Sequence, residues 1–184
     1  MASTDANRST NVAHIAGTPL QLRPITPDDA PGVERGFARL SPRSVYLRFL
    51  APIPRIPPAE LARLTNVDHF HREALVVVDG EEIVGVGRYE PTTGDDAEPA
   101  VAEVSVIITD AWQGRGVGRR LLDELAHLAA SRGYGALVCT ILAENHAALA
   151  LVRSVAPDVT VSRAGGVLDV RIPLAPPRAP GCAA

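Results

Sequence analysis

The sequence predicts an α/β protein with a single domain, in which a mixed sheet carries helices on both faces. A chain of 184 residues is long enough to bury one substantial core. Apolar residues recur at helical spacing between Gly116 and Arg132, and apolar runs typical of strands lie on both sides of that segment. A hydrophobic fraction of 46% and a charged fraction of 21% are typical of a soluble globular protein.

Three strands and two helices are predicted in the first half of the chain. They are a strand over 19–25, a helix from 26–29 to about Leu40, a short helix that opens at Pro58, and strands over 72–78 and 82–90. Pro27 and Pro58 lie where a first helical turn tolerates proline, and the proline-rich segment 51–58 is expected to form a loop. Asp79 and Gly80 supply the turn that joins the last two strands into a hairpin.

The second half of the chain predicts alternating strands and helices. They are a strand over 101–109, a helix over 116–132, a strand over 134–142, a helix over 146–154 and a closing hairpin over 159–174. Val117, Leu121 and Leu125 lie on one face of the longer helix, and Gly133 ends it. Asn145 is the expected N-cap of the next helix. The resulting order, β-α-α-β-β-β-α-β-α-β-β, implies about seven strands in a mixed sheet.

The charge and hydropathy of the chain limit its partners and its compartment. A formal net charge of -3 predicts neither a nucleic-acid partner nor binding to an anionic membrane. No segment approaches the roughly 20 apolar residues of a membrane span, and the first residues lack a signal-peptide pattern, so we predict a cytoplasmic protein. We expect residues 1–17 and 175–184 to be disordered tails around a domain at 18–174. Cys139 and Cys182 do not make a disulfide framework.

Gly114, Gly116 and Gly118 form a cluster that follows a strand and begins a helix. A P-loop requires Lys and Ser or Thr after the last glycine, where this sequence has Arg119 and Arg120, so that interpretation fails. A dinucleotide-binding fingerprint requires a third glycine at position 119 and fits poorly. The glycines either let the backbone approach a pyrophosphate at the helix N-terminus or form an ordinary loop, and the turn alone leaves both open.

The segment Gln113–Gly118 resembles the Q/R-x-x-G-x-G/A signature of the GNAT superfamily of N-acetyltransferases. Asn145 and Ala148 resemble the N-x-x-A element of that family, and the strand, turn, helix and next strand occur in the family's order. The resemblance implies the GNAT fold, with a central mixed, mostly antiparallel sheet of about seven strands and helices on both faces.

Three longer segments are similar to the catalytic domain of bacterial Pat-type protein lysine acetyltransferases. They are residues 41–49, 66–78 and 102–118, within a similarity that extends over about 18–174. Tyr46 and Arg48 lie in the first of these segments, where they either line the acceptor cleft or pack helices together.

The resemblance also implies which residues hold acetyl-CoA, the acetyl donor. The pantetheine arm would pair with backbone groups of Val106, Ile107 and Ile108. The remaining donor contacts would fall at Gln113, Gly114, Arg115, Gly116, Val117, Gly118, Arg119 and Asn145. A role of Asn145 as a plain N-cap competes with its donor contact, although the two can coexist. Many family members place a tyrosine seven residues after this asparagine to protonate the leaving thiolate, but the residue here is Val152, so we assign no general acid.

Acetyl transfer to a lysine amine requires a base, because that amine has a pKa of about 10.4 and is protonated at neutral pH. Strand alternation places Glu103, Ser105 and Ile107 on one face of the sheet. We expect burial at the start of the strand to raise the pKa of Glu103 toward a value suited to a general base, the role that the resemblance implies for it. The alternative is a solvated residue at the end of a strand.

The predicted function is N-acetyl transfer from acetyl-CoA to a primary amine, with a protein lysine as the first hypothesis. A small amine is the alternative acceptor, and a non-catalytic acyl-CoA-binding regulatory module is the alternative from another class. We expect a monomer or a homodimer. Asp68, His69 and His71 lack a further ligand at metal-site spacing, so no metal site is predicted.

Overall fold

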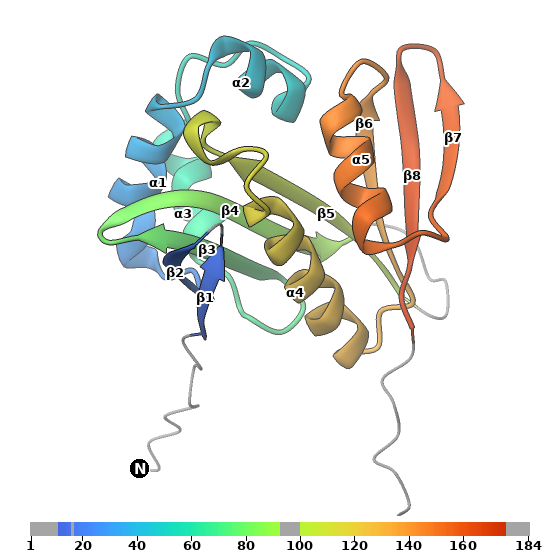
Figure 1. The fold of residues 1–184 in the computed structure, drawn as a ribbon, viewed down its shortest axis with the longest axis horizontal. Coiled ribbons are helices and arrows are strands. Elements are labelled where there is room, and N and C mark those ends of the chain that lie inside the picture. The colour runs from blue at the N-terminus through green and yellow to red at the C-terminus, as the bar shows by residue number, and fades with distance from the viewer. Residues whose placement is uncertain (1–10, 16, 93–99, 176–184) are drawn as a thin grey trace, which may run out of the picture.

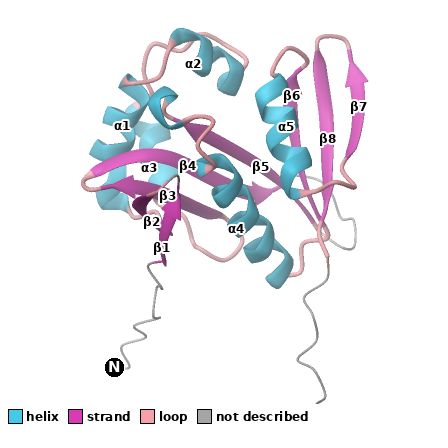
Figure 2. Cartoon of the chain, viewed as in Figure 1, coloured by secondary structure: helices cyan, strands magenta, loops and turns pink. Residues whose placement is uncertain are grey.

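The strands and helices follow one another in the order that the sequence predicts, with two additions (Figures 1 and 2). The computed structural model describes residues 11–15, 17–92 and 100–175. The strands are β1 (Asn11–Ile15), β2 (Thr18–Pro24), β3 (Glu73–Asp79), β4 (Glu82–Pro91), β5 (Val101–Ile108), β6 (Ala136–Leu142), β7 (Thr160–Ala164) and β8 (Val167–Pro173). The helices are α1 (Ala30–Ala38), α2 (Pro42–Phe49), α3 (Pro58–Thr65), α4 (Val117–Ser131) and α5 (His146–Val155).

The eight strands form one sheet in the order β1-β2-β3-β4-β5-β6-β8-β7. β5 and β6 are parallel, and the other neighbouring strands are antiparallel. The α4 and α5 helices lie in front of the sheet in the view of Figure 1, and α1 packs against β4. The predicted class, a mixed and mostly antiparallel sheet with helices on both faces, is therefore confirmed, with eight strands in place of about seven. No helix within the described residues has the length and apolar character needed to cross a bilayer.

β1 lies inside the segment 1–17 that the sequence predicted to be a disordered tail, and it pairs with β2. Gly17 has a φ of +81°, which glycine adopts without strain, and it lets the chain reverse between the two strands. Ile15 is buried in the core. Composition did not reveal this strand because its partner strand and the core stabilise it. The predicted tail residues 1–10 and 176–184 lie outside the described residues.

The second addition is α2, which falls in a segment that carried no helix prediction. Ser41 caps this helix, because its Oγ accepts a hydrogen bond from the Ser44 backbone N at 3.2 Å, and Pro42 occupies the first turn. The helix ends at Leu50, whose φ of 58° is left-handed. Val45 is the only buried residue of α2, so the sequence lacks the apolar periodicity that reveals a helix.

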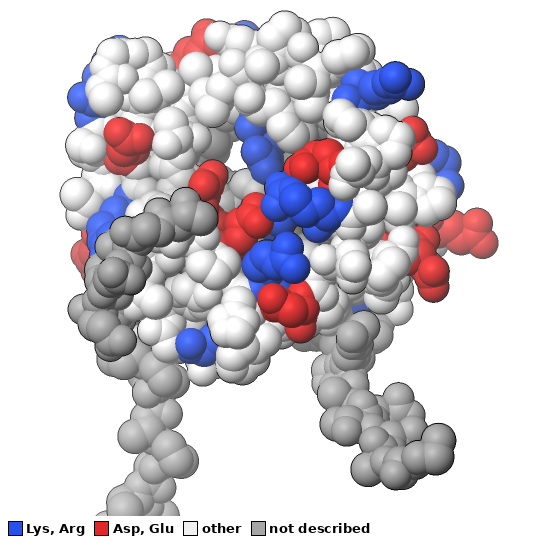
Figure 3. All heavy atoms as spheres, turned by 180° about the vertical axis from the view of Figure 1, so that it is seen from behind, with Lys and Arg blue, Asp and Glu red and all other residues white. Residues whose placement is uncertain are grey.

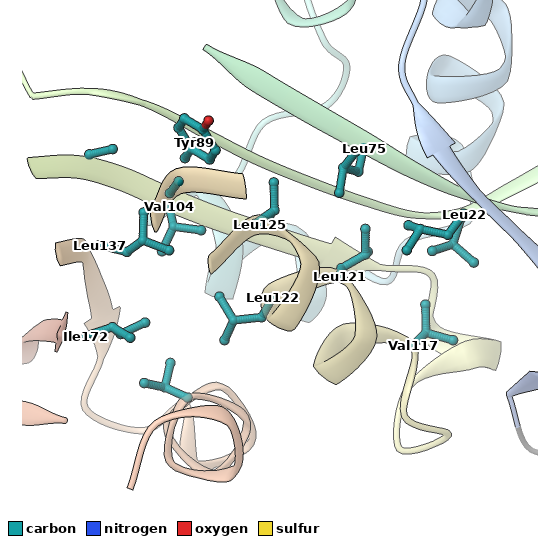
Figure 4. Packing of buried hydrophobic residues seen from close by; sticks show 14 of the residues in the cluster. Leu22, Leu75, Tyr89, Val104, Val117, Leu121, Leu122, Leu125, Leu137 and Ile172 are labelled. Carbon is teal, nitrogen blue, oxygen red and sulfur yellow. The ribbon is translucent and has the colours of Figure 1, made fainter. Parts of the chain in front are cut away.

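Two hydrophobic clusters cover the two faces of the sheet. Along β3, Leu75 and Val77 belong to the cluster under α4. The alternate residues, Ala74, Val76 and Val78, belong to the cluster under α1 and α3. Figure 4 shows Leu121 and Leu125 of α4 pointing from the helix toward the strands. The near-continuous apolar run of β3 is explained by burial on both sides.

Two glycines in β4 let α4 lie close to the sheet. A Cβ atom at Gly85 would lie 3.1 Å from Leu121 Cδ1, and one at Gly87 would lie 2.9 Å from Leu125 Cδ1. Both distances are tighter than an ordinary van der Waals contact, so a larger side chain would force these leucines of α4 to shift. Because the glycine turn precedes α4, this packing fixes the position of the turn relative to β5.

β5 and β6 separate after a short stretch of pairing (Figure 1). Their parallel register covers only three pairs and ends at Glu103↔Val138. On its other edge, β5 stays paired with β4 as far as Ile108. The sheet therefore opens between its two halves immediately after Glu103.

Candidate active site

A cleft of about 540 Å³ lies where β5 and β6 separate. Its walls come from α2, β5, the turn before α4, β6 and α5. Ten of the twelve predicted site residues line this cleft: Glu103, Val106, Ile107, Ile108, Gln113, Gly114, Gly116, Gly118, Arg119 and Asn145. The structure thus brings together residues that the sequence spreads over about 40 positions.

Two predicted site residues do not line the cleft. The side chain of Val117 is fully buried in the core under α4, so only its backbone is available to a ligand in the cleft. The guanidinium carbon of the exposed Arg115 lies 5.1 Å from the centre of the ring of Trp112, a residue that lines the cleft, in a cation–π contact.

The glycine turn ends at the N-terminus of α4. Gly114 and Gly116 have φ values of +69° and +91°, a region that strains residues with a Cβ atom. Gly116 is the N-cap residue of the 15-residue helix. The first N–H groups of a helix have no partner within it, and together with the helix dipole they favour an anion. Arg119 adds a positive charge at the cleft wall.

A hydrogen-bond network joins this turn to the N-terminus of α2. Asp110 accepts hydrogen bonds from the Ser41 backbone N at 2.9 Å, from Ser41 Oγ at 2.9 Å and from Ser44 Oγ at 2.8 Å. Gln113 Nε2 donates to Ser44 Oγ at 3.2 Å and to Ile108 O at 3.0 Å. We call Ser41, Ser44, Asp110 and Gln113 the α2 clasp. Sequence reasoning found only Gln113, although Ser41 before Pro42 is a helix-start signal.

Hydrogen bonding holds Asp110 of the α2 clasp in its ionised form. Burial alone would raise its pKa, but the hydrogen bonds from Ser41 and Ser44 together bring the pKa of Asp110 below its ordinary value. The carboxylate is therefore ready to accept these bonds at neutral pH.

The edge of β5 that faces β6 is unpaired beyond Glu103 in the described sheet. An extended chain with amide groups can hydrogen-bond to such an edge as an added strand would. Val106, Ile107 and Ile108, the residues predicted to contact the pantetheine arm, lie along this edge.

Glu103 lies where the two strands part, and its side chain is exposed in the cleft. The expectation that burial would desolvate this carboxylate is therefore wrong for the structure, because β6 diverges at that point and leaves the side chain open to solvent. The Cα atom of Glu103 is paired across β4 and β5 with that of Glu90. The cross-strand register places both carboxylates on the same face.

Alternate residues of β5 point to opposite faces of the sheet, and both sets line the cleft. The cleft therefore reaches both faces. Figure 3, which shows the face opposite α4 and α5, has a hollow bordered by mixed basic and acidic side chains. On the sheet face that Glu103 shares, Arg63 pairs with Glu90 at 2.9 Å, and Arg63 also pairs with Glu60 at 2.8 Å.

Three further side chains complete the description of the cleft. Asn145 Oδ1 accepts a hydrogen bond from Ala148 N at 3.1 Å, so the residue caps α5 while it lines the cleft. Val152 lines the cleft at the position where the resemblance expects a tyrosine. Cys139, on β6, also lines it, and burial with some help from the charge of Glu103 raises the pKa of its thiol to about 11.

Of the remaining candidates, Arg48 lines the cleft, whereas Tyr46 does not. His69 Nδ1 lies 2.6 Å from Glu73 Oε1 and is held in a structural pair instead of a metal site. Within the residues that the structure describes, no three His, Cys, Asp or Glu side chains gather as a metal site would require.

Comparison with known proteins places this geometry among acetyltransferases. The family model described as "Acetyltransferase (GNAT) family" matches residues 44–155. Acetyltransferase PA5475 of Pseudomonas aeruginosa is 30% identical over 135 residues, which are 71% of this chain and 70% of that protein. The N-alpha-acetyltransferase RimI of Mycobacterium tuberculosis is 52% identical over 104 residues, which are 54% of this chain and 59% of that protein.

Solved structures show the same arrangement of strands and helices. The GNAT domain of S. lividans PAT superposes with a TM-score of 0.82 and 30% identity, covering 90% of this chain and 97% of that one. The acetyltransferase yncA of Salmonella typhimurium, solved with acetyl-CoA, superposes with a TM-score of 0.70 and 20% identity, covering 89% and 98%. The second likeness bears on the fold alone.

Proposed function

This chain belongs to the acetyltransferase (GNAT) family, an acetyl-CoA-dependent family, and we propose that it acetylates a primary amine with Glu103 as the general base. One observation carries the proposal. Glu103 is the residue at which β5 and β6 part, so a carboxylate stands where the unpaired strand edge begins. An acetyl donor held along that edge would present its reactive end beside the carboxylate.

The residues of the cleft fit acetyl-CoA on three counts. The left-handed Gly114 and Gly116 and the N-terminus of α4 suit a pyrophosphate, with Arg119 adding charge. The unpaired edge at Val106–Ile108 suits the amides of a pantetheine arm. Asn145 lies on the opposite wall. When bound, acetyl-CoA supplies an acetyl thioester, the electrophile of the reaction.

Glu103 is proposed to accept the proton that the acceptor amine must lose. An ammonium group with a pKa of about 10.4 is not nucleophilic, so a carboxylate within reach, directly or through one water, is required. The exposed side chain of Glu103 in the cleft can receive an acceptor from the face opposite α4 and α5. Val152 carries no proton donor, so we assign no general acid for the leaving group.

We propose a protein lysine as the acceptor. Glu103 points to one face of the sheet, and the side chains of Thr140, Asp169 and Arg171 on that same face of β6 and β8 are exposed. An open polar surface beside the base suits a macromolecule, which can place a lysine in the hollow while resting on the strands. The resemblance of residues 41–49, 66–78 and 102–118 to Pat-type protein lysine acetyltransferases supports an acceptor of that class.

The second candidate is a small amine, favoured by one observation. A separate cavity adjoins the cleft at Arg48, Ser105 and Ile107. A small acceptor could extend into that cavity, whereas a lysine side chain on a protein would not need it.

An acceptor screen tests the proposed function. The protein is incubated with acetyl-CoA and with lysine-containing proteins, polyamines and amino acids, and thiol release is followed for each. Release that depends on an amine supports the proposal, and the preferred amine identifies the class. Tight acetyl-CoA binding without thiol release for any amine would favour the non-catalytic binding module instead.

A further inference from the structure

A second cavity, of about 70 Å³, lies on the other side of β4 and β5 from α4. Most of its wall is apolar and comes from α1, α2 and the strands, including Phe37, Phe49 and Ile83. Two guanidinium groups, those of Arg48 and Arg88, interrupt this apolar wall. Space of this size holds about five water-sized groups.

Arg88 brings unsatisfied hydrogen-bond donors to this cavity. Only 5% of the residue is exposed. Its Nη2 lies 3.0 Å from Glu90 Oε1, an ion pair without hydrogen-bond geometry, and Nε and Nη1 have no partner among the described residues. Buried donors without partners are costly, so a site that keeps them has a reason to do so.

Arg48 adds a second positive charge beside Arg88. Its Nη2 donates to Ser105 Oγ at 2.7 Å, and within the described parts of the chain it forms no ion pair. Burial and then the charge of Arg88 lower the pKa of Arg48, and the charges of Glu103 and Glu90 offset this only in part. Burial lowers the pKa of Arg88 as well.

The carboxylates nearby leave the donors of Arg88 unsatisfied. Glu90 contacts Arg88, but Arg63 also holds Glu90, at 2.9 Å from the outer side. The charges of Glu103 and Glu60 act on Arg48 and Arg88 as well, yet no described group accepts a hydrogen bond from Nε or Nη1 of Arg88. An anion with an apolar body would accept hydrogen bonds from these free donors and suit the apolar wall.

We propose that Arg48 and Arg88 form a subsite for a carboxylate on a short aliphatic stem, carried by the amine acceptor. The Cα atom of Arg88 pairs with that of Ser105, two residues along β5 from Glu103. Two residues of a strand span roughly 7 Å. One acceptor could therefore place its amine at Glu103 and a carboxylate, on a stem of a few carbon atoms, at the two arginines. The link to the acceptor rests on the proposed function, whereas the anion site does not.

Direct binding of butyrate tests the anion site without turnover. Titration calorimetry compares butyrate with butyramide, its neutral isostere, on the wild-type protein, on Arg88→Met and on Arg48→Met. Arg35→Met, on α1 but outside the cavity wall, is the matched control. We expect butyrate to bind at least about tenfold tighter than butyramide. Arg88→Met and Arg48→Met should each lower the affinity for butyrate by roughly 10- to 100-fold, as expected for the loss of hydrogen bonds to a charged group.

Equal binding of butyrate and butyramide, or full binding by both arginine variants, would overturn the proposal. Circular dichroism checks that each variant is folded. Should Arg88→Met not fold, Arg48→Met decides, because its residue lies on the partly exposed helix α2. Arg35→Met is expected to bind butyrate like the wild type.

Matched acceptor pairs test the link to the amine and identify the source of the carboxylate. One pair is 5-aminopentanoate and pentylamine, and the other is a lysine peptide with a neighbouring Glu and the same peptide with Gln. A higher kcat/KM for the carboxylate member of either pair supports the proposal, and equal values in both pairs overturn its acceptor part. A complete lack of transfer would refute the proposed function, and butyrate binding would still decide the anion site.

Discussion

The two walls of the cleft are built in different ways. The proposed donor wall centres on Gln113–Arg119, a contiguous turn whose contribution is mostly backbone geometry. The proposed acceptor wall combines Arg48 and Glu103, side chains from α2 and β5, with Arg88 of β4 in the adjoining cavity. A contiguous turn leaves a motif in the sequence, whereas side chains that meet only through strand register leave none.

This difference predicts separate effects of mutation on the two walls. Changes to the donor wall should act on acetyl-CoA affinity through backbone strain. Changes to the acceptor wall should act on the chemical step or on the acceptor through charge. The following variants test this separation.

The largest effect is expected for Glu103→Gln. Loss of the base should lower kcat by roughly 10²- to 10⁴-fold, while the Kd for acetyl-CoA stays within about twofold of the wild type. Steady-state kinetics and calorimetry measure the two quantities. Unchanged turnover would remove Glu103 from the mechanism.

Gly116→Val tests the donor wall. A β-branched residue at a φ of +91° costs about 1–3 kcal/mol, and we expect the Kd for acetyl-CoA to rise roughly 10- to 100-fold. The acceptor KM should change little. Gly165→Val is the control, because Gly165 has a φ of +61° in the β7–β8 hairpin, outside the cleft wall. Equal loss of affinity in both variants would show a general loss of stability instead of a local effect.

Asp110→Asn tests the α2 clasp, where the two walls meet. A neutral amide accepts weaker hydrogen bonds and presents an N–H group to one of its present donors, so both walls should loosen slightly. We expect the KM for acetyl-CoA and for the acceptor to rise together, by about two- to fivefold. Asp123→Asn on α4, outside the cleft wall, provides the comparison. A change in only one KM would mean that the clasp serves one wall alone.

The smallest effect is the acid dependence of the same clasp. The pKa of Asp110 is lowered in the folded protein, so the unfolded chain binds more protons near the ordinary value of 3.8. Its stabilising contribution is therefore complete above that value and is lost as the pH falls through the lowered pKa. Chemical denaturation of the wild type and Asp110→Asn should show a difference at pH 6 that shrinks toward pH 3. A difference that grows toward low pH would contradict this sign.

Most of the fold could be predicted from the sequence, because periodicity reports burial. The leucines of α4 and the two-sided apolar run of β3 recur at the spacing that their environments require. The elements that were missed, α2 and β1, have too few buried residues or depend on a partner strand.

The candidate site shows the same division. The glycine turn could be predicted from the sequence, because positive φ values favour glycine at positions 114 and 116. The exposure of Glu103 and the meeting of Arg48 with Arg88 depend on where β6 diverges and on the register of β4 against β5. No local pattern encodes these two features.

The separation of β5 and β6 also has a mechanical consequence. Within the described residues, the half-sheet formed by β6, β8 and β7 pairs with the rest of the sheet through three residue pairs of β5 and β6, and it also packs against the other half through contacts of α4 with α5 and of α4 and α2 with β6. A ligand that hydrogen-bonds to both β5 and β6 would reduce the motion of β6, β8 and β7 relative to β5. We therefore expect hydrogen exchange in β6 to slow on donor binding, although the strand lies outside the glycine turn that we propose as the pyrophosphate site.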